Sequence, residues 1–373
     1  MAADGRKGAA AGVPFVTSAF PEVDFRASQT VTVENELELR EALASFDAVR
    51  LAGTGSAQSR VPAPDDEVAV VSLAGMGRIL RLEADDLTCS VEAGVLRADL
   101  DRELEECRLW LPCGGDGTLG GLFAADEIGP LGPAQPEPRS LLLGMTAMLA
   151  EGKRFRSGAR VVKNVAGFDL QKLFVGSRGR LFAVTELHLK LRPRPRAMLH
   201  FLNDDLSREE ALDLAARLRR DPTRPASLIV AGNESLAVSG TLAGNPSHLD
   251  RLAKQFGLVR IADAPASGRE QDNVEADLTR EVVRGQIRFR RVVDLLAKLP
   301  STAEFRFAGE RFEIHLDKDK TDELLADLPS CGAAGEITEG VAARRGIGTT
   351  GDPNSVRLAA GLKAALDPKG VLR

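Results

Sequence analysis

The sequence contains no tyrosine and few of the side chains that carry acid–base or thiol chemistry. Its 373 residues include 4 histidines, 4 cysteines and one tryptophan. No two cysteines form a CxxC pair, which argues against a zinc domain, an iron–sulfur cluster held by this chain and a disulfide framework. No two histidines have metal-ligand spacing, so no metal site is predicted. We expect any demanding chemistry to belong to a bound cofactor.

The sequence also lacks a large excess of charge of either sign. Its 49 Lys+Arg and 54 Asp+Glu give a net charge of −5, which excludes a polycation that binds nucleic acid. Residues 1–14 have no apolar core of the kind that a signal peptide or a membrane anchor needs. We therefore expect a cytoplasmic protein with no membrane span. A length of 373 residues exceeds what one hydrophobic core usually holds, which predicts two domains.

Hydrophobic periodicity indicates helices and strands in the first part of the chain. Leucines recur four residues apart over 96–104, the spacing of an amphipathic helix, and 141–149 is apolar like a buried strand. The run 181–191 alternates, which predicts a strand with its odd-numbered residues on one face and Phe182, Val184 and His188 on the other. It stops at Arg192-Pro-Arg-Pro-Arg196, which we interpret as a hinge because prolines bar both a helix and a central strand.

The second part of the chain combines helix signals with hairpin signals. Ser207 and Glu210 have the spacing of a capping box that opens a helix. Apolar residues alternate on either side of Ala308-Gly309, which predicts a β-hairpin. We therefore expect an antiparallel sheet covered by helices. The predicted organisation is a flexible tail over 1–27, a first domain over 28–195 and a second over 196–373.

Two glycine-rich loops are candidates for binding phosphate. Gly53-Thr-Gly-Ser56 follows a predicted strand, and its small residues let backbone N–H groups converge on an anion. Gln58 in place of a third glycine, with prolines close behind, excludes a Rossmann fingerprint. In the second loop, Thr118-Leu-Gly-Gly121 offers one hydroxyl donor beside exposed backbone amides. Taken alone, the first loop is better explained as a structural turn, and the second equally well as a hairpin with a helix packed on it.

A third segment resembles a known family, and this resemblance indicates a function for both glycine loops. Val162-Lys-Asn-Val-Ala-Gly-Phe-Asp169 and the run that follows it to Pro193 resemble the FAD-binding domain of the vanillyl-alcohol oxidase and p-cresol methylhydroxylase (PCMH) superfamily. More narrowly, they are similar to the small FAD-binding subunits of bacterial glycolate oxidases. The order and spacing of the two earlier loops match the family's pyrophosphate loop and its Thr-Ile-Gly-Gly loop. The resemblance spans 28–195 and returns at 362–372.

The resemblance implies an α+β fold, with a two-lobed PCMH-type FAD-binding domain over 28–195. A smaller α+β cap domain with an antiparallel sheet and a C-terminal helix would follow over 196–373. By position, the resemblance assigns these residues to the cofactor site: Gly53, Thr54, Gly55 and Ser56 at the pyrophosphate; Thr118, Gly120 and Gly121 beside the ribityl–phosphate chain, together with Leu119 and Gly129 of the same segment; Asn164, Gly167, Gly176, Ser177 and Gly179 along the wall; and the backbone of Val184 at the adenine or flavin edge.

Some positions depart from the family pattern. Ser56 and Ala57 stand where relatives often carry a histidine for covalent attachment, so we expect FAD to be bound non-covalently. Phe182 places a ring where relatives let the backbone approach the cofactor. Asp126 and Glu127 add two carboxylates near the expected phosphate site, and their repulsion would weaken anion binding unless they point outward.

The resemblance predicts an FAD-dependent oxidoreductase subunit that takes part in the oxidation of a small 2-hydroxy acid. Its expected partners are a catalytic flavoprotein subunit and an iron–sulfur subunit, since this chain has no cysteines spaced for a cluster. One alternative is a scaffold that kept the fold and lost the flavin. Another is a reductase similar to the UDP-N-acetylenolpyruvoylglucosamine type. The sequence of residues 164–169 argues against this second alternative.

No catalytic residue is assigned. Structural roles are favoured for the remaining candidates: His188, His200, His248 and His315; the basic cluster Arg154, Arg156, Arg160 and Lys163, as a strand edge rather than a clamp for a substrate carboxylate; Asp169, as the cap of a following helix; and Trp110, as a core residue.

Overall fold

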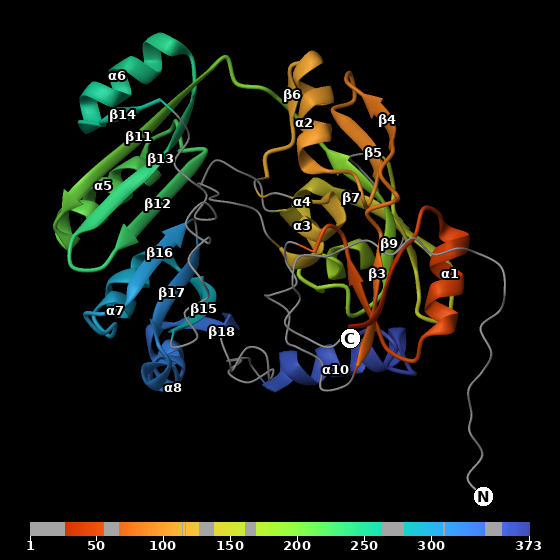
Figure 1. Ribbon diagram of the computed structural model, residues 1–373. Helices are drawn as coiled ribbons and strands as arrows, with labels where there is room; N and C mark the ends of the chain where they lie inside the picture. Colours follow the sequence, from red (N-terminus) through yellow and green to blue (C-terminus); the bar gives the residue numbers. More distant parts are fainter. Residues whose placement is uncertain are drawn as a thin grey trace, which may run out of the picture.

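The computed structural model describes residues 27–55, 67–113, 115, 117–126, 138–160, 169–262, 280–308, 310–339 and 353–373. Over these residues the fold is mixed α and β, as predicted, and it forms two halves that lie side by side (Figure 1). No helix in the described part of the chain is long and apolar enough to cross a membrane.

The first half begins with a small parallel sheet. Its strand order is β1 (Ala27–Thr32), β3 (Val68–Ser72), β2 (Val49–Ala52). Helix α1 (Glu36–Ser45) starts at Asn35, whose side chain accepts hydrogen bonds from two backbone N–H groups of the first turn. Leu39 and Leu43 of α1 pack into a core with the strands. The end of the chain joins this core, since Val371 and Leu372 are buried there after helix α10 (Pro353–Leu366).

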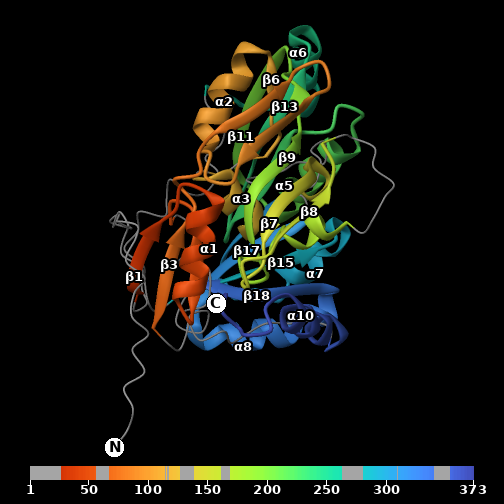
Figure 2. The same cartoon turned by 90° about the vertical axis from the view of Figure 1, so that its right-hand side faces the viewer.

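A five-stranded antiparallel sheet forms the second lobe of this half. Its order is β4 (Ile79–Glu83), β5 (Thr88–Glu92), β9 (Ala183–Lys190), β7 (Leu142–Met148), β8 (Arg154–Gly158). Helices α2 (Arg97–Glu106) and α3 (Leu119–Ala125) contribute Leu100, Leu104 and Phe123 to its core. The helix expected over 96–104 and the strand expected over 141–149 are both present. Figure 2 shows this sheet beside the small parallel one, with α10 below.

Strand β9 departs from the alternation predicted for 181–191. Its pairing with β7 shifts register between Thr146 and Ala147, so Thr185 is an extra residue in the strand, a β-bulge. The bulge turns Val184 to the same core as Leu187 and Leu189, although the sequence placed Val184 on the opposite face. Thr185 instead directs its hydroxyl to Glu36 of α1, at 2.9 Å. The prediction of one unbroken alternation is therefore wrong.

The chain leaves β9 at Lys190, pairs β10 (Arg192–Pro193) with β6 (Leu109–Trp110), and enters the second half at Ala197. There it forms an eight-stranded antiparallel sheet. In order, its strands are β14 (Arg260–Ile261), β11 (Ala197–Leu206), β13 (Leu236–Gly244), β12 (Ser227–Gly232), β16 (Glu304–Ala308), β17 (Arg311–Asp317), β15 (Arg280–Ile287) and β18 (Ala333–Glu339).

Four helices pack on this sheet, and their apolar side chains complete its core. They are α5 (Arg208–Arg220), α6 (Pro246–Phe256), α7 (Val292–Leu296) and α8 (Lys318–Asp327). Single turns complete the described elements: α4 (Pro138–Leu141), η2 (Leu170–Leu173), η3 (Phe289–Arg291) and η4 (Leu328–Cys331). The expected capping box opens α5, with Ser207 and Glu210 each bonding the other's backbone N–H. The expected hairpin is β16 with β17. The predicted antiparallel sheet covered by helices is thus confirmed.

Candidate functional site

A pocket lies between the two lobes of the first half and encloses about 680 Å³ of space, its open mouth included. Its walls come from the end of β2 and the loop after it, from α3, and from the segment that leads into β9. Eight of the predicted site residues line it: Gly53, Thr54, Gly55, Thr118, Gly120, Gly121, Gly179 and Val184. Segments more than 120 residues apart in the chain are thus brought together as the resemblance implied.

The other predicted site residues lie elsewhere. Leu119, the first residue of α3, is buried in the core of the second lobe. Gly176 and Ser177 lie in the turn before Gly179 and do not line the pocket. Ser56, Gly129, Asn164 and Gly167 lie outside the described residues, and so does Glu127. Sequence reasoning missed Arg178, which does line the pocket and is the only cation inside the Gly176–Gly179 motif.

The glycines of the two loops allow the lobes to approach closely. Thr118 caps α3, and its Oγ1 accepts the N–H of Gly121 at 3.2 Å. A Cβ atom on Gly53 would lie 1.9 Å from that same Oγ1, so no larger residue fits without displacing the cap. A Cβ atom on Gly120 would lie 2.8 Å from both Cβ and O of Ala93. Glycine is therefore required here by packing between the lobes.

The backbone amides at the start of α3 are not presented to a ligand. The N–H of Leu119 donates to Val95 O at 2.9 Å, and that of Gly120 donates to Ala93 O at 2.8 Å. The N–H of Gly121 is taken by Thr118. The expectation of exposed amides is wrong at these three positions, because α3 begins against the end of β5 and its first donors are used there. The Thr118 hydroxyl keeps its own hydrogen, which it can donate.

The rest of the pocket wall is mainly apolar. Leu51, Leu73 and Phe174 contribute to it together with Phe182. The Phe182 side chain is 1% exposed and packs edge-on against Phe155, with ring centroids 5.4 Å apart. This ring therefore belongs to the core of the second lobe and forms part of the pocket wall from there.

These residues fit a cofactor that combines a flat apolar ring system with a phosphate-bearing chain. The apolar wall suits the rings, and the Thr118 hydroxyl and the Arg178 guanidinium suit the phosphates. Ser177 adds a second observation, because its Oγ is buried and has no hydrogen-bond partner among the described residues. Buried hydroxyls are normally satisfied, so this one is a candidate contact for a bound polar group beside the pocket.

The carboxylate of Asp126 is engaged by the second half of the molecule. Asp126 ends α3, and its Oδ2 accepts a hydrogen bond from Arg311 of β17 at 2.7 Å. Its backbone oxygen accepts a second hydrogen bond from the same guanidinium at 2.9 Å. Of the two carboxylates expected to oppose phosphate binding, the one that the structure describes is therefore paired with a cation.

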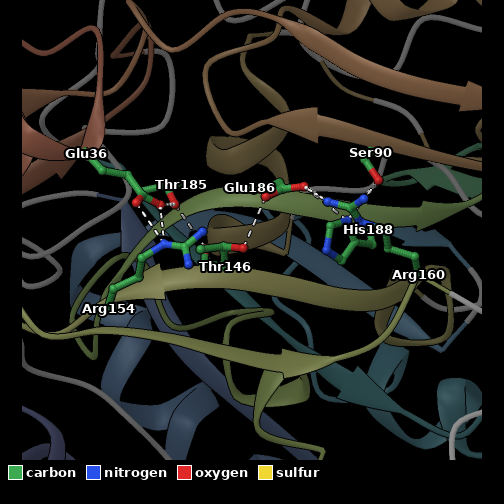
Figure 3. Close-up of polar contacts among 8 residues, drawn as sticks. All are labelled: Glu36, Ser90, Thr146, Arg154, Arg160, Thr185, Glu186 and His188. Atoms are coloured by element: carbon green, nitrogen blue, oxygen red, sulfur yellow. Dashed lines mark hydrogen bonds and ion pairs between the residues drawn. The ribbon is translucent and has the colours of Figure 1, made fainter.

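A separate polar network occupies one face of the five-stranded sheet (Figure 3). His188 Nδ1 lies 3.0 Å from Ser90 Oγ and 3.6 Å from Glu186 Oε1. Burial lowers the pKa of His188, the Glu186 carboxylate opposes this shift, and the charges of Arg160 and Arg156 add to it. Because serine and carboxylate both face Nδ1, the cluster lacks the arrangement of a hydrolytic triad. None of these residues lines the pocket.

The basic side chains near this face pair with carboxylates of the chain itself. Arg154 contacts Glu36 at 2.8 Å, and Arg160 contacts Glu186 at 3.2 Å, which supports the strand-edge interpretation over a substrate clamp. Lys163 lies outside the described residues. Asp169 does not cap a helix as predicted: its Oδ1 accepts from the Gln171 side chain at 2.9 Å, and the segment that follows is a single 3₁₀ turn.

The other histidines also bond to neighbouring side chains. His200 contacts Thr241 at 2.9 Å, and His315 Nε2 contacts Glu313 at 2.9 Å. Burial would raise the pKa of Glu313, but the hydrogen bond from His315 and the charge of Arg284 together hold it well below its usual value. Among the described residues, no three His, Cys, Asp or Glu side chains are grouped as a metal site would require.

Comparison with known proteins shows what part of this chain is similar to. Residues 27–158 match the model of the family described as "FAD binding domain". Glycolate oxidase subunit GlcE of Escherichia coli is 35% identical over 149 residues, which are 39% of this chain and 42% of that protein. Glycolate oxidase subunit GlcD of Bacillus subtilis is 31% identical over 172 residues, 44% of this chain and 37% of that protein. These matches span less than half the length of either relative.

Two further comparisons widen this picture. A probable mitochondrial D-lactate dehydrogenase of Danio rerio is 31% identical over 152 residues, 39% of this chain and 31% of that protein. The solved structure of an alkyldihydroxyacetonephosphate synthase superposes with a TM-score of 0.68 at 14% identity, covering 93% of this chain and 75% of that one. At that identity the likeness concerns the fold alone, and it confirms the expected two-part α+β architecture.

Proposed function

We propose that this chain, whose residues 27–158 match the FAD binding domain family, carries a PCMH-type FAD-binding domain and is a subunit of an FAD-dependent oxidoreductase that takes part in the oxidation of a small 2-hydroxy acid. The pocket between the lobes carries the proposal, because it joins two glycine loops, a hydroxyl donor, a guanidinium and an apolar wall. Glycolate and D-lactate, which the names of the relatives contain, are both 2-hydroxy acids.

In this proposal each part of the pocket has a role toward the cofactor. The backbone of Gly53–Gly55 and the Thr118 hydroxyl hold the phosphate-bearing chain, and Arg178 offsets its negative charge. The Ser177 hydroxyl turns to a polar group of the cofactor. Attachment is non-covalent, since Ser56 and Ala57 replace the usual histidine. Bound FAD supplies the two-electron acceptor for such an oxidation.

The described part of the pocket wall offers no general base. Among the described residues that line it, Arg178 is the only one with a titratable side chain. Oxidation of an alcohol needs a group that removes the hydroxyl proton. We propose that a catalytic flavoprotein subunit provides this base and that an iron–sulfur subunit carries electrons onward. We place the FAD-binding domain at 28–195 and the cap domain at 196–373.

The same observation favours a second candidate function. A chain whose pocket lacks a base could serve as an accessory subunit that keeps the fold and binds FAD weakly or not at all. The two candidates differ in the purified protein: only an FAD-binding subunit shows flavin absorbance and releases FAD on denaturation.

The test begins with the visible spectrum of the full chain and a titration of its apo form with FAD. Saturable uptake supports the first candidate, and a colourless chain that takes up no FAD refutes it. Anaerobic addition of glycolate or D-lactate to the chain, alone and co-purified with its partners, then shows which assembly bleaches the flavin. Bleaching by NADPH instead would identify a reductase.

A further inference from the structure

Arg311 of the second half holds the end of a helix in the first half. Its two hydrogen bonds to Asp126 engage the backbone oxygen and the carboxylate together. The side chains are 42% and 26% exposed, so the contact is partly shielded from water. A guanidinium that donates two hydrogen bonds fixes orientation as well as distance. One side chain of the cap half therefore fixes the residue at which α3 ends.

Helix α3 forms one wall of the pocket along its whole length. Thr118, Gly120 and Gly121 line the pocket at the start of the helix, and Ala124 and Ala125 line it at the end. Asp126 follows Ala125 directly and does not itself line the pocket, so this residue marks the rim of the pocket at the end of α3.

Asp126 also lies beside the segment that leads to the pocket residues Arg178 and Gly179. A Cβ atom on Gly176 would lie 3.7 Å from the Cβ atom of Asp126. The N–H of the pocket residue Arg178 donates to Ala124 O at 2.8 Å. A carboxylate between these two segments repels a phosphate chain in the pocket unless a cation offsets it.

The backbone at Asp126 is also unusual. Its φ of 57° and ψ of 35° lie in the left-handed region, where an aspartate is tolerated at some cost. A charged residue in such a conformation at the rim of an anion pocket needs a compensating contact. Arg311 provides one for the charge and one for the backbone.

We propose that Arg311 is a positioning residue for the cofactor, which sets FAD affinity by neutralising Asp126 and holding the end of α3. Binding in the first half then depends on the second half being docked. This inference rests on the proposed function, since it concerns the affinity of the same pocket for FAD.

The test compares the FAD dissociation constants of full-length apo variants, measured by quenching of flavin fluorescence. Arg311→Met removes the charge and keeps the length of the side chain. Asp126→Asn removes the carboxylate and keeps a residue that tolerates the left-handed region. The double variant combines the two changes, and Arg311→Lys keeps the charge. Arg290→Met, an exposed arginine on η3, is the control for loss of one positive charge from the same half.

We expect Arg311→Met to weaken FAD binding about fivefold at low ionic strength and less at 0.5 M salt, because salt screens the freed carboxylate. Arg311→Lys and Arg290→Met should stay within about twofold of the wild type. The decisive result is the double variant, which should regain most of the lost affinity. A purely structural role for Arg311 predicts no such rescue.

Two other outcomes overturn the inference. One is an Arg311→Met variant that binds FAD as the wild type does at every salt concentration. The other is a double variant as weak as Arg311→Met. A wild-type chain that takes up no FAD is a separate result, because it refutes the proposed function itself. Thermal unfolding of the apo variants shows whether each one is folded before FAD is added.

Discussion

Gly53→Ala tests directly whether the two lobes meet as closely as the structure shows. The added Cβ would lie 1.9 Å from Thr118 Oγ1 and 2.9 Å from both Thr118 Cβ and Thr118 Cγ2. Ordinary contacts begin near 3.4 Å, so the hydroxyl must move by about 1.5 Å. Rotating Thr118 moves the hydroxyl but leaves its Cβ in place. The backbone of one lobe must therefore shift as well.

The expected cost has two parts. Moving the hydroxyl breaks the cap of α3, which is worth about 1 kcal/mol. The remaining overlap is an overpacking cost of about 1 to 3 kcal/mol. The free energy of unfolding should therefore fall by about 2 to 4 kcal/mol. Thr118→Ala removes two of the three clashing atoms, so the double variant should cost less than the sum of the single changes.

Urea unfolding followed by tryptophan fluorescence measures this effect in the correct half. Trp110 is the only tryptophan of the chain and lies in β6 of the first half. Gly361→Ala is the matched control, because its Cβ meets nothing within 4 Å in α10, and alanine there should stabilise by up to about 1 kcal/mol. If Gly53→Ala is as stable as the wild type, or its effect adds to that of Thr118→Ala, the close approach of the lobes is refuted.

Two further substitutions probe buried charge in the first half. Asp367 is 2% exposed and accepts hydrogen bonds from Lys363 and from the backbone of Val371 and Leu372, so Asp367→Asn should cost about 2 kcal/mol in the same urea assay. Burial opposes the charged form of Asp367, but these partners hold its pKa below its ordinary value. The stabilisation that the Asp367 carboxylate gives to the folded state is therefore present above pH 4 and is lost as the pH falls through the lowered pKa. His188 has a lowered pKa, so the neutral form is favoured on folding and stability should decline as the pH falls below about 6.5. His188→Gln should flatten that decline. An unchanged pH profile in this variant would contradict the claim that His188 causes the decline.

The sequence predicted most elements of the fold because their signals are local. Leucine spacing, the capping box at Ser207 and the hairpin around Ala308 each depend on residues close together in the chain. The alternation of strand β9 was predicted without its break at Thr185, because a bulge depends on the register with the partner strand and no local pattern carries that register. The role of Asp169 was wrong for a similar reason, since Gln171 competes for its carboxylate.

The candidate site was located through motif order, but its donors required the structure. A glycine loop indicates room for an anion. The sequence does not show which backbone N–H groups of that loop already donate hydrogen bonds within the protein. Here Ala93 and Val95 accept two of the amides at the start of α3, so side chains must supply the contacts that those amides would have made. Under the proposed function, anion binding would therefore depend mainly on the Thr118 hydroxyl and on Arg178, the pocket cation that sequence reasoning missed.

The carboxylate at the rim shows why the two halves have to be considered together. Within the first half alone, Asp126 counts against phosphate binding, and from the sequence it was a reason to expect weak affinity for FAD. Its cation lies 185 residues further along the chain, on a strand of the other sheet. Charge at the pocket is therefore a property of the docked halves, and a change that separates them restores the repulsion without altering a single lining residue. FAD affinity should thus respond to substitutions between the halves as well as to those in the pocket.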